Sequence, residues 1–141
     1  MNFNLERFIK AQDSCFADVI AELKAGRKKT HWMWFVFPQL EGLGRSSTAR
    51  FYGISGQEEA EAYLENDILR ERLVECAEIV LSVNHRSLFE IFGNPDQIKF
   101  CSSMTLFEAV RPDMTTFSDC LAKYCDGKRD LGTLGLLNIK E

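Results

Sequence analysis

Apolar residues recur at intervals of three and four positions along much of this chain, and this periodicity restricts the fold more than any other feature. Near the N-terminus the recurring residues are Leu5, Phe8, Ile9, Phe16, Val19, Ile20 and Leu23. This spacing places them on one face of an amphipathic helix. We therefore predict one helix here that ends at Gly26, because glycine adopts the left-handed conformation that closes many helices.

Further helix starts are predicted by residues that satisfy the unpaired N–H groups of a first helical turn. Ser55 with Glu58 and Ser87 with Glu90 have the spacing of a capping box. Asp67 precedes a continuous apolar stripe, which predicts the longest helix of the chain.

The C-terminal half continues the helical pattern. Gly93, Asn94 and Pro95 indicate the end of one helix and the start of the next, because proline is tolerated at the first helical position. Nowhere does the sequence show the apolar–polar alternation that is typical of a half-buried strand. We predict an all-α fold, a compact single-domain bundle of about seven or eight helices over residues 1–141. The last helices are expected at about 95–110, at about 114–125 and after Asp130.

Composition agrees with one globular domain, since the chain has 141 residues of which 45% are apolar and 27% charged. No apolar run approaches the roughly 18 residues of a membrane span, and residues 1–10 do not resemble an export signal. We therefore expect a cytoplasmic protein that does not contact a membrane. No C-x-x-C pair occurs, so we expect buried thiols and neither a metal site nor a disulfide. The cysteines are Cys15, Cys76, Cys101, Cys120 and Cys125.

Residues 24–53 differ from the rest of the chain. They contain both tryptophans, Trp32 and Trp34, and a glycine loop at residues 42–44. They also contain six basic residues against Glu41 alone, so the window carries a formal charge of +5 and the other residues carry −9. The net charge of −4 argues against DNA or RNA as a partner. The window is nevertheless the place to look for a small anionic ligand.

The apolar run at residues 31–37 fits either a buried strand or a buried helix. A lone strand would leave its backbone groups unpaired, so we favour a helix that is capped by Thr30 and ends near Phe37, before Pro38. The simplest expectation is that Trp32 and Trp34 belong to the core. Stacking of one of them on a ligand is the alternative.

The residues after the glycine loop suggest an anion site. Arg45, Ser46 and Ser47 precede a short predicted helix, and the N–H groups at a helix start attract negative charge. A capped helix with a solvent-exposed arginine is the alternative. Gln39 and Tyr52 are candidates for orienting hydrogen bonds to the same ligand.

Two further side chains are candidates for chemistry. His31 is suited to proton transfer by its pKa, although a histidine beside two tryptophans is more often a core residue. Ser103 lies in a stretch of hydroxyl side chains that we expect to bend its helix or to line a pocket. The candidate ligand-binding residues are therefore Trp32, Trp34, Gln39, Gly44, Arg45, Ser46, Ser47, Tyr52 and Ser103, with His31 as the catalytic candidate and with no metal or cofactor expected.

Three stretches, HWMWFVFPQLEGLGRSSTARFYGI, EAYLENDILRERL and IFGNPDQIKFCSSMTLFEAV, resemble in this order the bacterial family called domain of unknown function 1810. Its members are sometimes labelled calpastatin, but nothing in this sequence resembles a long disordered inhibitor. The resemblance extends from about Phe8 to about Leu137 and implies a compact multihelical domain. It implies no activity, so no catalytic residue is carried over from it.

These observations leave two main hypotheses for function, besides a purely structural or stress-related role. The first is a pocket for an anionic nucleotide or nucleotide-sugar similar to ADP-ribose, with hydrolysis as a further step. The second is a non-catalytic protein-interaction module in which the aromatic segment is core. Convergence of five side chains on one hollow would favour the first hypothesis, namely those of His31, Trp34, Gln39, Arg45 and Ser103. Enclosure of both Trp32 and Trp34 by aliphatic side chains, with Arg45 pointing to solvent, would exclude it.

Overall fold

The structure is a computed structural model that describes residues 3–139. Within that range the chain forms α-helices α1 to α10 and one short 3-10 helix, η1, and its only strand-like pairing is an isolated parallel bridge between Leu40 and Ile54. The all-α prediction is therefore confirmed. The elements are α1 Glu6–Asp13, α2 Phe16–Lys24, α3 Met33–Val36, η1 Glu41–Leu43, α4 Ser47–Phe51, α5 Gln57–Glu65, α6 Asp67–Ser82, α7 Leu88–Phe92, α8 Asp96–Val110, α9 Thr115–Tyr124 and α10 Leu131–Leu136.

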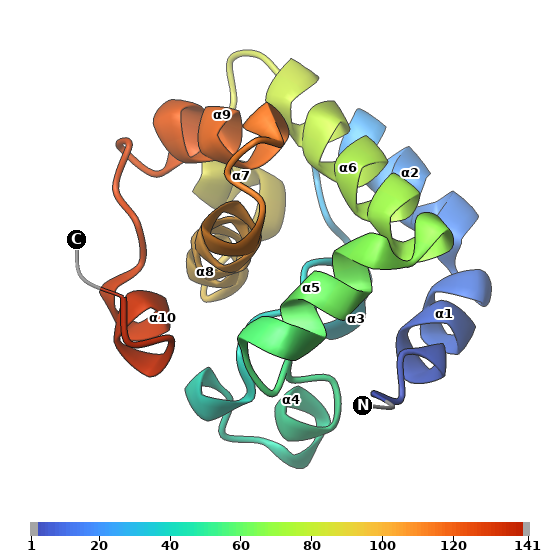
Figure 1. Cartoon of the computed structure of the whole chain (residues 1–141). Coiled ribbons are helices and arrows are strands. Elements are labelled where there is room, and N and C mark those ends of the chain that lie inside the picture. Colours follow the sequence, from blue (N-terminus) through green and yellow to red (C-terminus); the bar gives the residue numbers. More distant parts are fainter. Residues whose placement is uncertain (1–2, 140–141) are drawn as a thin grey trace.

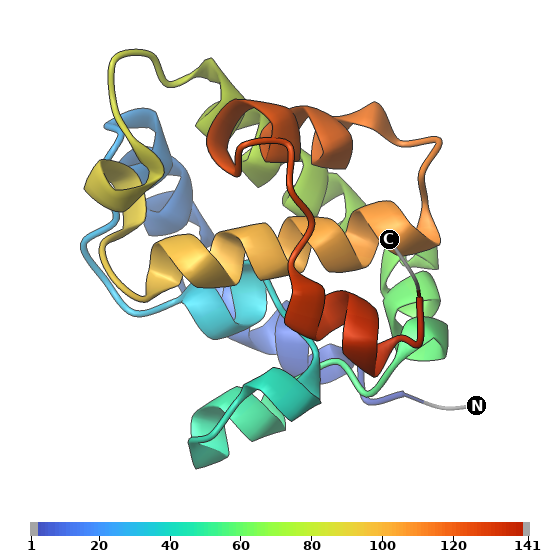
Figure 2. The same cartoon turned by 90° about the vertical axis from the view of Figure 1, so that its left-hand side faces the viewer.

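Helix α8 crosses the middle of the molecule (Figure 2), and α9 folds back over it. The N-terminal helices α1 and α2 lie on the side of α6, and α10 lies against α8 on the opposite side (Figure 1). The core between these layers is rich in aromatic rings. Its largest fully buried side chains include Phe8, Trp32, Phe37, Tyr63, Phe100, Phe107 and Phe117.

The single N-terminal helix that the periodicity predicted is divided into α1 and α2. The chain leaves the helical conformation at Cys15, whose φ is −144°. Just before the break the Ser14 hydroxyl donates a hydrogen bond to the carbonyl oxygen of Ala11 at 2.9 Å, and such side chains compete with helical backbone bonds. The break lets α1 pack on α3 while α2 packs on α6. With this division, the described residues form more helices than the seven or eight predicted.

Of the two predicted capping boxes, one is present in the structure and the other is not. The capping box of Ser87 and Glu90 is present at the start of α7. The one predicted at Ser55 and Glu58 is wrong: α5 begins after Gly56, and the Ser55 N–H donates to the buried carboxylate of Glu59 at 2.8 Å.

Helix α8 is continuous, although its hydroxyl-rich stretch was expected to bend or interrupt it. Ser102 and Thr105 donate hydrogen bonds to the carbonyl oxygens four residues earlier, at 3.2 and 2.8 Å. Their polar groups are therefore satisfied inside the helix, and the backbone ladder is not disrupted.

The expectation that no cysteine forms a disulfide is wrong, because Cys101 and Cys125 are joined. The return of α9 over α8 brings the end of α9 beside the middle of α8, and a separation of 24 residues in sequence gives no sign of this proximity. Cys76 and Cys120 are buried thiols, and burial raises the pKa of each to about 12. The cytoplasmic location stays a prediction. Among the described helices, none is both long enough and apolar enough to span a bilayer.

Candidate functional site

The carboxylate of Glu22 in α2 fixes the conformation of the basic segment that precedes α3. It accepts hydrogen bonds from the N–H groups of Lys29 and Thr30 at 2.7 and 3.0 Å, from the Thr30 hydroxyl at 2.6 Å and from Trp32 Nε1 at 3.0 Å. Burial alone would raise the pKa of Glu22, but these hydrogen bonds to its charged form lower the pKa to about 2. Thr30 therefore binds Glu22 and does not cap α3, which has no side-chain cap.

We expect the contribution of Glu22 to stability to depend on pH. Its pKa in the folded state, about 2, lies below the ordinary value of 4.5, so the charged form stabilises the fold above pH 4.5 and this stabilisation is lost as the pH falls toward 2. Glu22→Gln should lower the free energy of unfolding by about 1 kcal/mol at neutral pH, since the site is partly exposed and solvent screens it. Urea unfolding of both proteins between pH 7 and pH 2.5 measures the difference, which should shrink below pH 4.5. A difference that stays constant over this range would contradict the assignment.

Trp32 is a core residue and offers no face to a ligand. Its side chain is 1% exposed, and its ring lies 6.3 Å from that of Phe37 and 6.4 Å from that of Phe92, measured between centroids. Lys28 Nζ lies 5.2 Å from the Trp32 ring and 3.0 Å from a carboxylate oxygen of Asp96. One cation of the basic segment is therefore already paired inside the protein.

Three of the predicted residues do converge. Trp34, Gln39 and Tyr52 line a small cavity together with Lys99, whose Nζ lies 5.8 Å from the Trp34 ring. The cavity has a volume of about 10 Å³, which is close to the minimum for one water molecule. These side chains pack against one another where α3, α4 and α8 meet, and the space between them is too small for a nucleotide base.

The chain between residues 39 and 56 is closed at its base by backbone hydrogen bonds. The N–H of Glu41 donates to the carbonyl of Ile54 at 2.8 Å, and the N–H of Ile54 donates to the carbonyl of Gln39 at 2.9 Å. Gly53 is required here, because a Cβ at this position would lie 2.4 Å from the Glu41 Cα. The two ends of the loop are therefore held together, and the glycine loop with α4 projects from them (Figure 1).

The start of α4 is a capped and solvated helix end. The Ser46 hydroxyl oxygen accepts a hydrogen bond from the Ala49 N–H at 3.0 Å, and Arg45, Ser46 and Ser47 are all exposed. With only five residues, α4 is too short to have the dipole on which the anion-site argument relied. These three residues thus have the surroundings of the alternative, a capped helix with a solvated arginine.

An open hollow does occur on the other side of this loop, between residues 40–56 and α10, and we call it the glycine-loop hollow. Its volume is about 440 Å³, within the range of small-ligand sites. Its charged side chains, Glu41 and Arg50, are exposed and form no ion pair with each other or with another described residue. The hollow is lined by Leu40, Glu41, Gly42, Gly44, Arg50, Ile54, Ser55, Gly56 and Leu136.

The remaining candidates lie outside the hollow. His31 is exposed just before α3, and Ser103 is completely buried in α8, where its Oγ has no hydrogen-bond partner among the described residues. Gly44 is the one predicted ligand-binding residue among those that line the hollow. Within residues 3–139 no three histidine, cysteine or acidic side chains are grouped as a bound metal ion would require.

Sequence reasoning missed the two charged residues of the hollow. Glu41 and Arg50 were counted in the charge of the window, but no motif distinguishes Arg50 from Arg45. The position on α4 determines which of the two arginines lines the hollow. Arg50 lies in the last turn of α4, on the side of the hollow. Leu136 had no sequence signal, because α10 reaches the loop only through the tertiary fold.

The sequence matches the family described as protein of unknown function (DUF1810) over residues 2–137. Among solved structures, the crystal structure of the conserved hypothetical protein Rv1873 from Mycobacterium tuberculosis is 52% identical, covers 98% of this chain and 99% of its own, and has a TM-score of 0.95. No curated protein matches the chain. The likeness to Rv1873 agrees with the multihelical fold described above.

Proposed function

This chain belongs to the DUF1810 family, and we propose that it binds a small phosphorylated ligand in the glycine-loop hollow. The observation that carries this proposal is the pair of opposite charges, Glu41 and Arg50, which line one open hollow of about 440 Å³ without neutralising each other. Charged side chains that form no ion pair within residues 3–139 are available to a charged or polar group of a ligand.

The two charges select the chemistry of the ligand. The Arg50 guanidinium is suited to a phosphate, which it binds through two parallel hydrogen bonds. The Glu41 carboxylate only accepts hydrogen bonds and is suited to sugar hydroxyl groups. Leu40, Ile54 and Leu136 provide apolar surface beside them. A nucleotide or nucleotide-sugar similar to ADP-ribose contains all the required groups and is the class that we propose.

We propose binding and not hydrolysis. The side chains that line the hollow include one carboxylate, that of Glu41, and no imidazole among the described residues. His31 lies exposed outside it. A general acid and a general base must both be within hydrogen-bond reach of the reacting bond, and this lining supplies a single candidate.

Calorimetric titration with ADP-ribose, AMP and inorganic phosphate tests the proposal. We expect saturable binding of ADP-ribose that Arg50→Ala weakens at least tenfold, because a charge-assisted hydrogen bond contributes about 1.5–3 kcal/mol. Arg45→Ala is the matched control: it removes the same charge from an exposed position outside the hollow and should change the dissociation constant less than twofold. Glu41→Gln should weaken ADP-ribose binding and leave the binding of inorganic phosphate unchanged.

Two results would overturn the proposal. One is the absence of a binding signal for all three ligands at millimolar concentrations. The other is an equal loss with Arg45→Ala and Arg50→Ala, which would assign the binding to the diffuse positive charge of the window and not to the hollow.

A further inference from the structure

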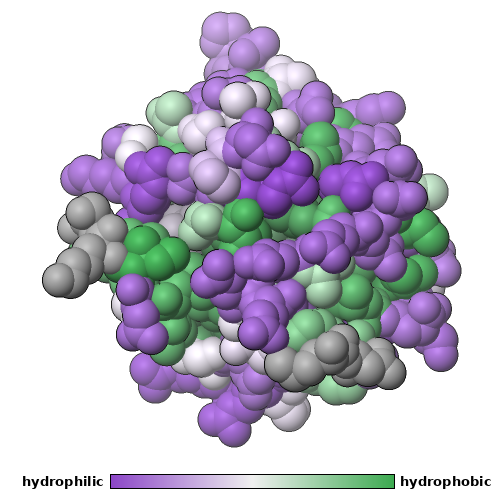
Figure 3. Space-filling view, viewed as in Figure 1, coloured by the Kyte–Doolittle hydropathy of each residue, from purple (hydrophilic) through white to green (hydrophobic). Residues whose placement is uncertain are grey.

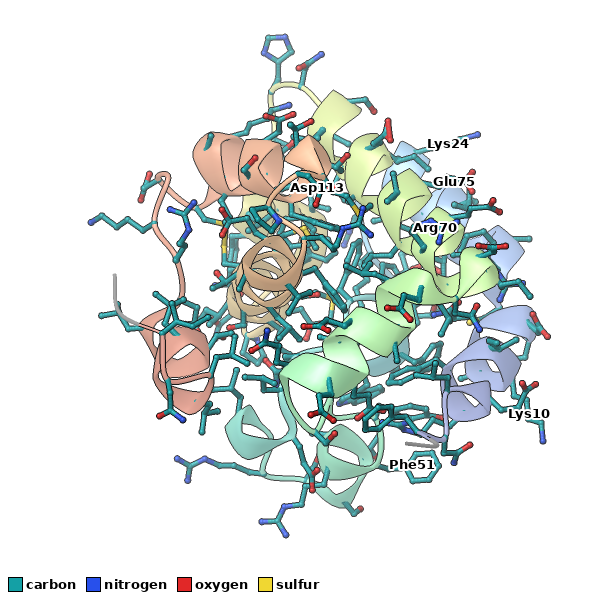
Figure 4. All side chains as sticks on the ribbon, viewed as in Figure 1. Lys10, Lys24, Phe51, Arg70, Glu75 and Asp113 are labelled. Atoms are coloured by element: carbon teal, nitrogen blue, oxygen red, sulfur yellow. A yellow bond between two sulfur atoms is a disulfide. The ribbon has the colours of Figure 1, made fainter. Side chains whose placement is uncertain are left out.

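A second concave surface lies along α6, beside the segment that leads from α8 into α9, and we call it the α6 groove. Figure 4 shows Arg70 and Glu75 on α6 and Asp113 on the segment opposite. The same face carries apolar surface between hydrophilic side chains (Figure 3). The groove has a volume of about 720 Å³, and its lining includes Glu71, Val74, Glu75, Glu78, Ile79 and Met114.

The lining residues of α6 follow one face of the helix. They recur at intervals of three and four positions between Arg70 and Ser82, which corresponds to about three helical turns and roughly 18 Å of length. Val74, Ile79 and Met114 are half-buried and form the apolar floor. A floor of this length and shape matches the apolar stripe of another helix.

The edge of the groove is negatively charged. Glu71, Glu75 and Glu78 are exposed, and none of them forms an ion pair within residues 3–139. Arg70 and Arg111 do not compensate for them, because each of these two cations is paired with an aspartate. Arg70 lies 2.8 Å from Asp67, and Arg111 lies 2.9 Å from Asp113.

We propose that the α6 groove docks a basic amphipathic helix of about three turns from a partner protein. The apolar stripe of that helix covers Val74, Ile79 and Met114, and its lysine and arginine side chains pair with the row of glutamates. Met114 is suited to this role, since a flexible thioether adapts to different apolar surfaces. The glutamates repel the phosphates of nucleic acids and of anionic lipids, so the charge selects a protein partner. This surface is separate from the glycine-loop hollow and does not depend on the function proposed for it.

The probe is a fluorescein-labelled amphipathic peptide, LKKLLKLLKKLLKL, with LEELLELLEELLEL as its acidic counterpart. Fluorescence anisotropy should show saturable binding of the lysine peptide and no binding of the glutamate peptide. Glu75→Lys combined with Glu78→Lys should weaken binding at least tenfold, and added salt should weaken it in the wild type. Glu58→Lys reverses an exposed charge on α5, outside the groove, and should change binding less than twofold.

Amide chemical shifts of the wild-type protein locate the binding independently of any variant. Shifts that are confined to α6 and residues 111–116 support the proposal. Shifts elsewhere, or equal weakening by Glu58→Lys, overturn it. A concentration-dependent dimer in light scattering that Glu75→Lys abolishes also overturns it, because the groove would then bind a second copy of this chain.

Discussion

Arg7→Ala is expected to lower the free energy of unfolding by about 3–5 kcal/mol, because it leaves a buried carboxylate without its counter-ion. Arg7 Nη2 lies 2.9 Å from Glu59 Oε2, and the two side chains are 10% and 4% exposed. The same guanidinium donates hydrogen bonds to the carbonyl oxygens of Phe51 at 2.8 Å and Gly53 at 3.0 Å. The substitution therefore also releases the end of the loop that lines the glycine-loop hollow. Chemical denaturation at neutral pH measures the loss.

Arg111→Ala is the matched control, since Arg111 forms an equally short ion pair with Asp113 but with side chains that are 39% and 66% exposed. It should lower the free energy of unfolding far less than Arg7→Ala, because solvent screens an exposed ion pair. Replacing Arg7 and Glu59 together by apolar residues should recover part of the loss, because no buried charge then remains. A loss below 1 kcal/mol for Arg7→Ala would mean that water reaches this pair.

Phe37→Ala is expected to lower the free energy of unfolding by about 3–5 kcal/mol through the cavity that it creates in the aromatic core. The Phe37 side chain is 1% exposed, and its ring centroid lies 5.0 Å from that of Phe100, 5.8 Å from that of Phe92 and 6.3 Å from that of Trp32. These rings come from α3 with its flanking residues, from α7 and from α8, so one truncation weakens contacts among all three.

The chain contains its own control for this substitution. Phe51→Ala removes the same side chain from α4, where Phe51 is 56% exposed and lies at the edge of the molecule, with its ring centroid 4.9 Å from that of Tyr52 (Figure 4). Its effect should stay below about 1 kcal/mol. Thermal or urea unfolding of the two variants gives the comparison. Similar losses would show that the aromatic core near Phe37 is not closely packed.

Helix starts that depend on neighbouring residues were predictable from the sequence, and the exception at Ser55 has a physical cause. The cap formed by Ser87 and Glu90 was predicted correctly, and so was the helix after Asp130, whose carboxylate accepts a hydrogen bond from the Thr133 N–H. Both involve neighbours in sequence. Ser55 also has the spacing of a capping residue, but its N–H is recruited by Glu59, which Arg7 holds in place from α1. A tertiary contact there overrides the local preference.

The glycine-loop hollow lies partly in the segment that the charge singled out, but of its lining residues only Gly44 was among the predicted ligand-binding residues. The excess of positive charge directed attention to residues 24–53, and Glu41 and Arg50 of the glycine-loop hollow lie in that segment. The sequence could not show that Lys28 is neutralised by Asp96, which lies 68 positions later in the chain. Nor could it show that Trp34, Gln39 and Tyr52 close around a space for a single water molecule. Ion pairs and side-chain packing inside the fold occupy some of the charged and aromatic side chains, and the composition of a sequence does not show which ones.

The sequence by itself determined that this protein is helical, where most of its helices begin and end, and which segment carries the unusual charge. Helical periodicity and capping depend on residues within one or two turns of each other, so both can be predicted from the sequence. Only the tertiary structure decided that Cys101 bonds to Cys125, that Glu41 and Arg50 form no ion pair within residues 3–139, and that a row of glutamates borders an apolar groove on α6. Each of these features depends on how separate helices pack against one another. That packing is determined by side chains from the whole core and not by neighbours in sequence.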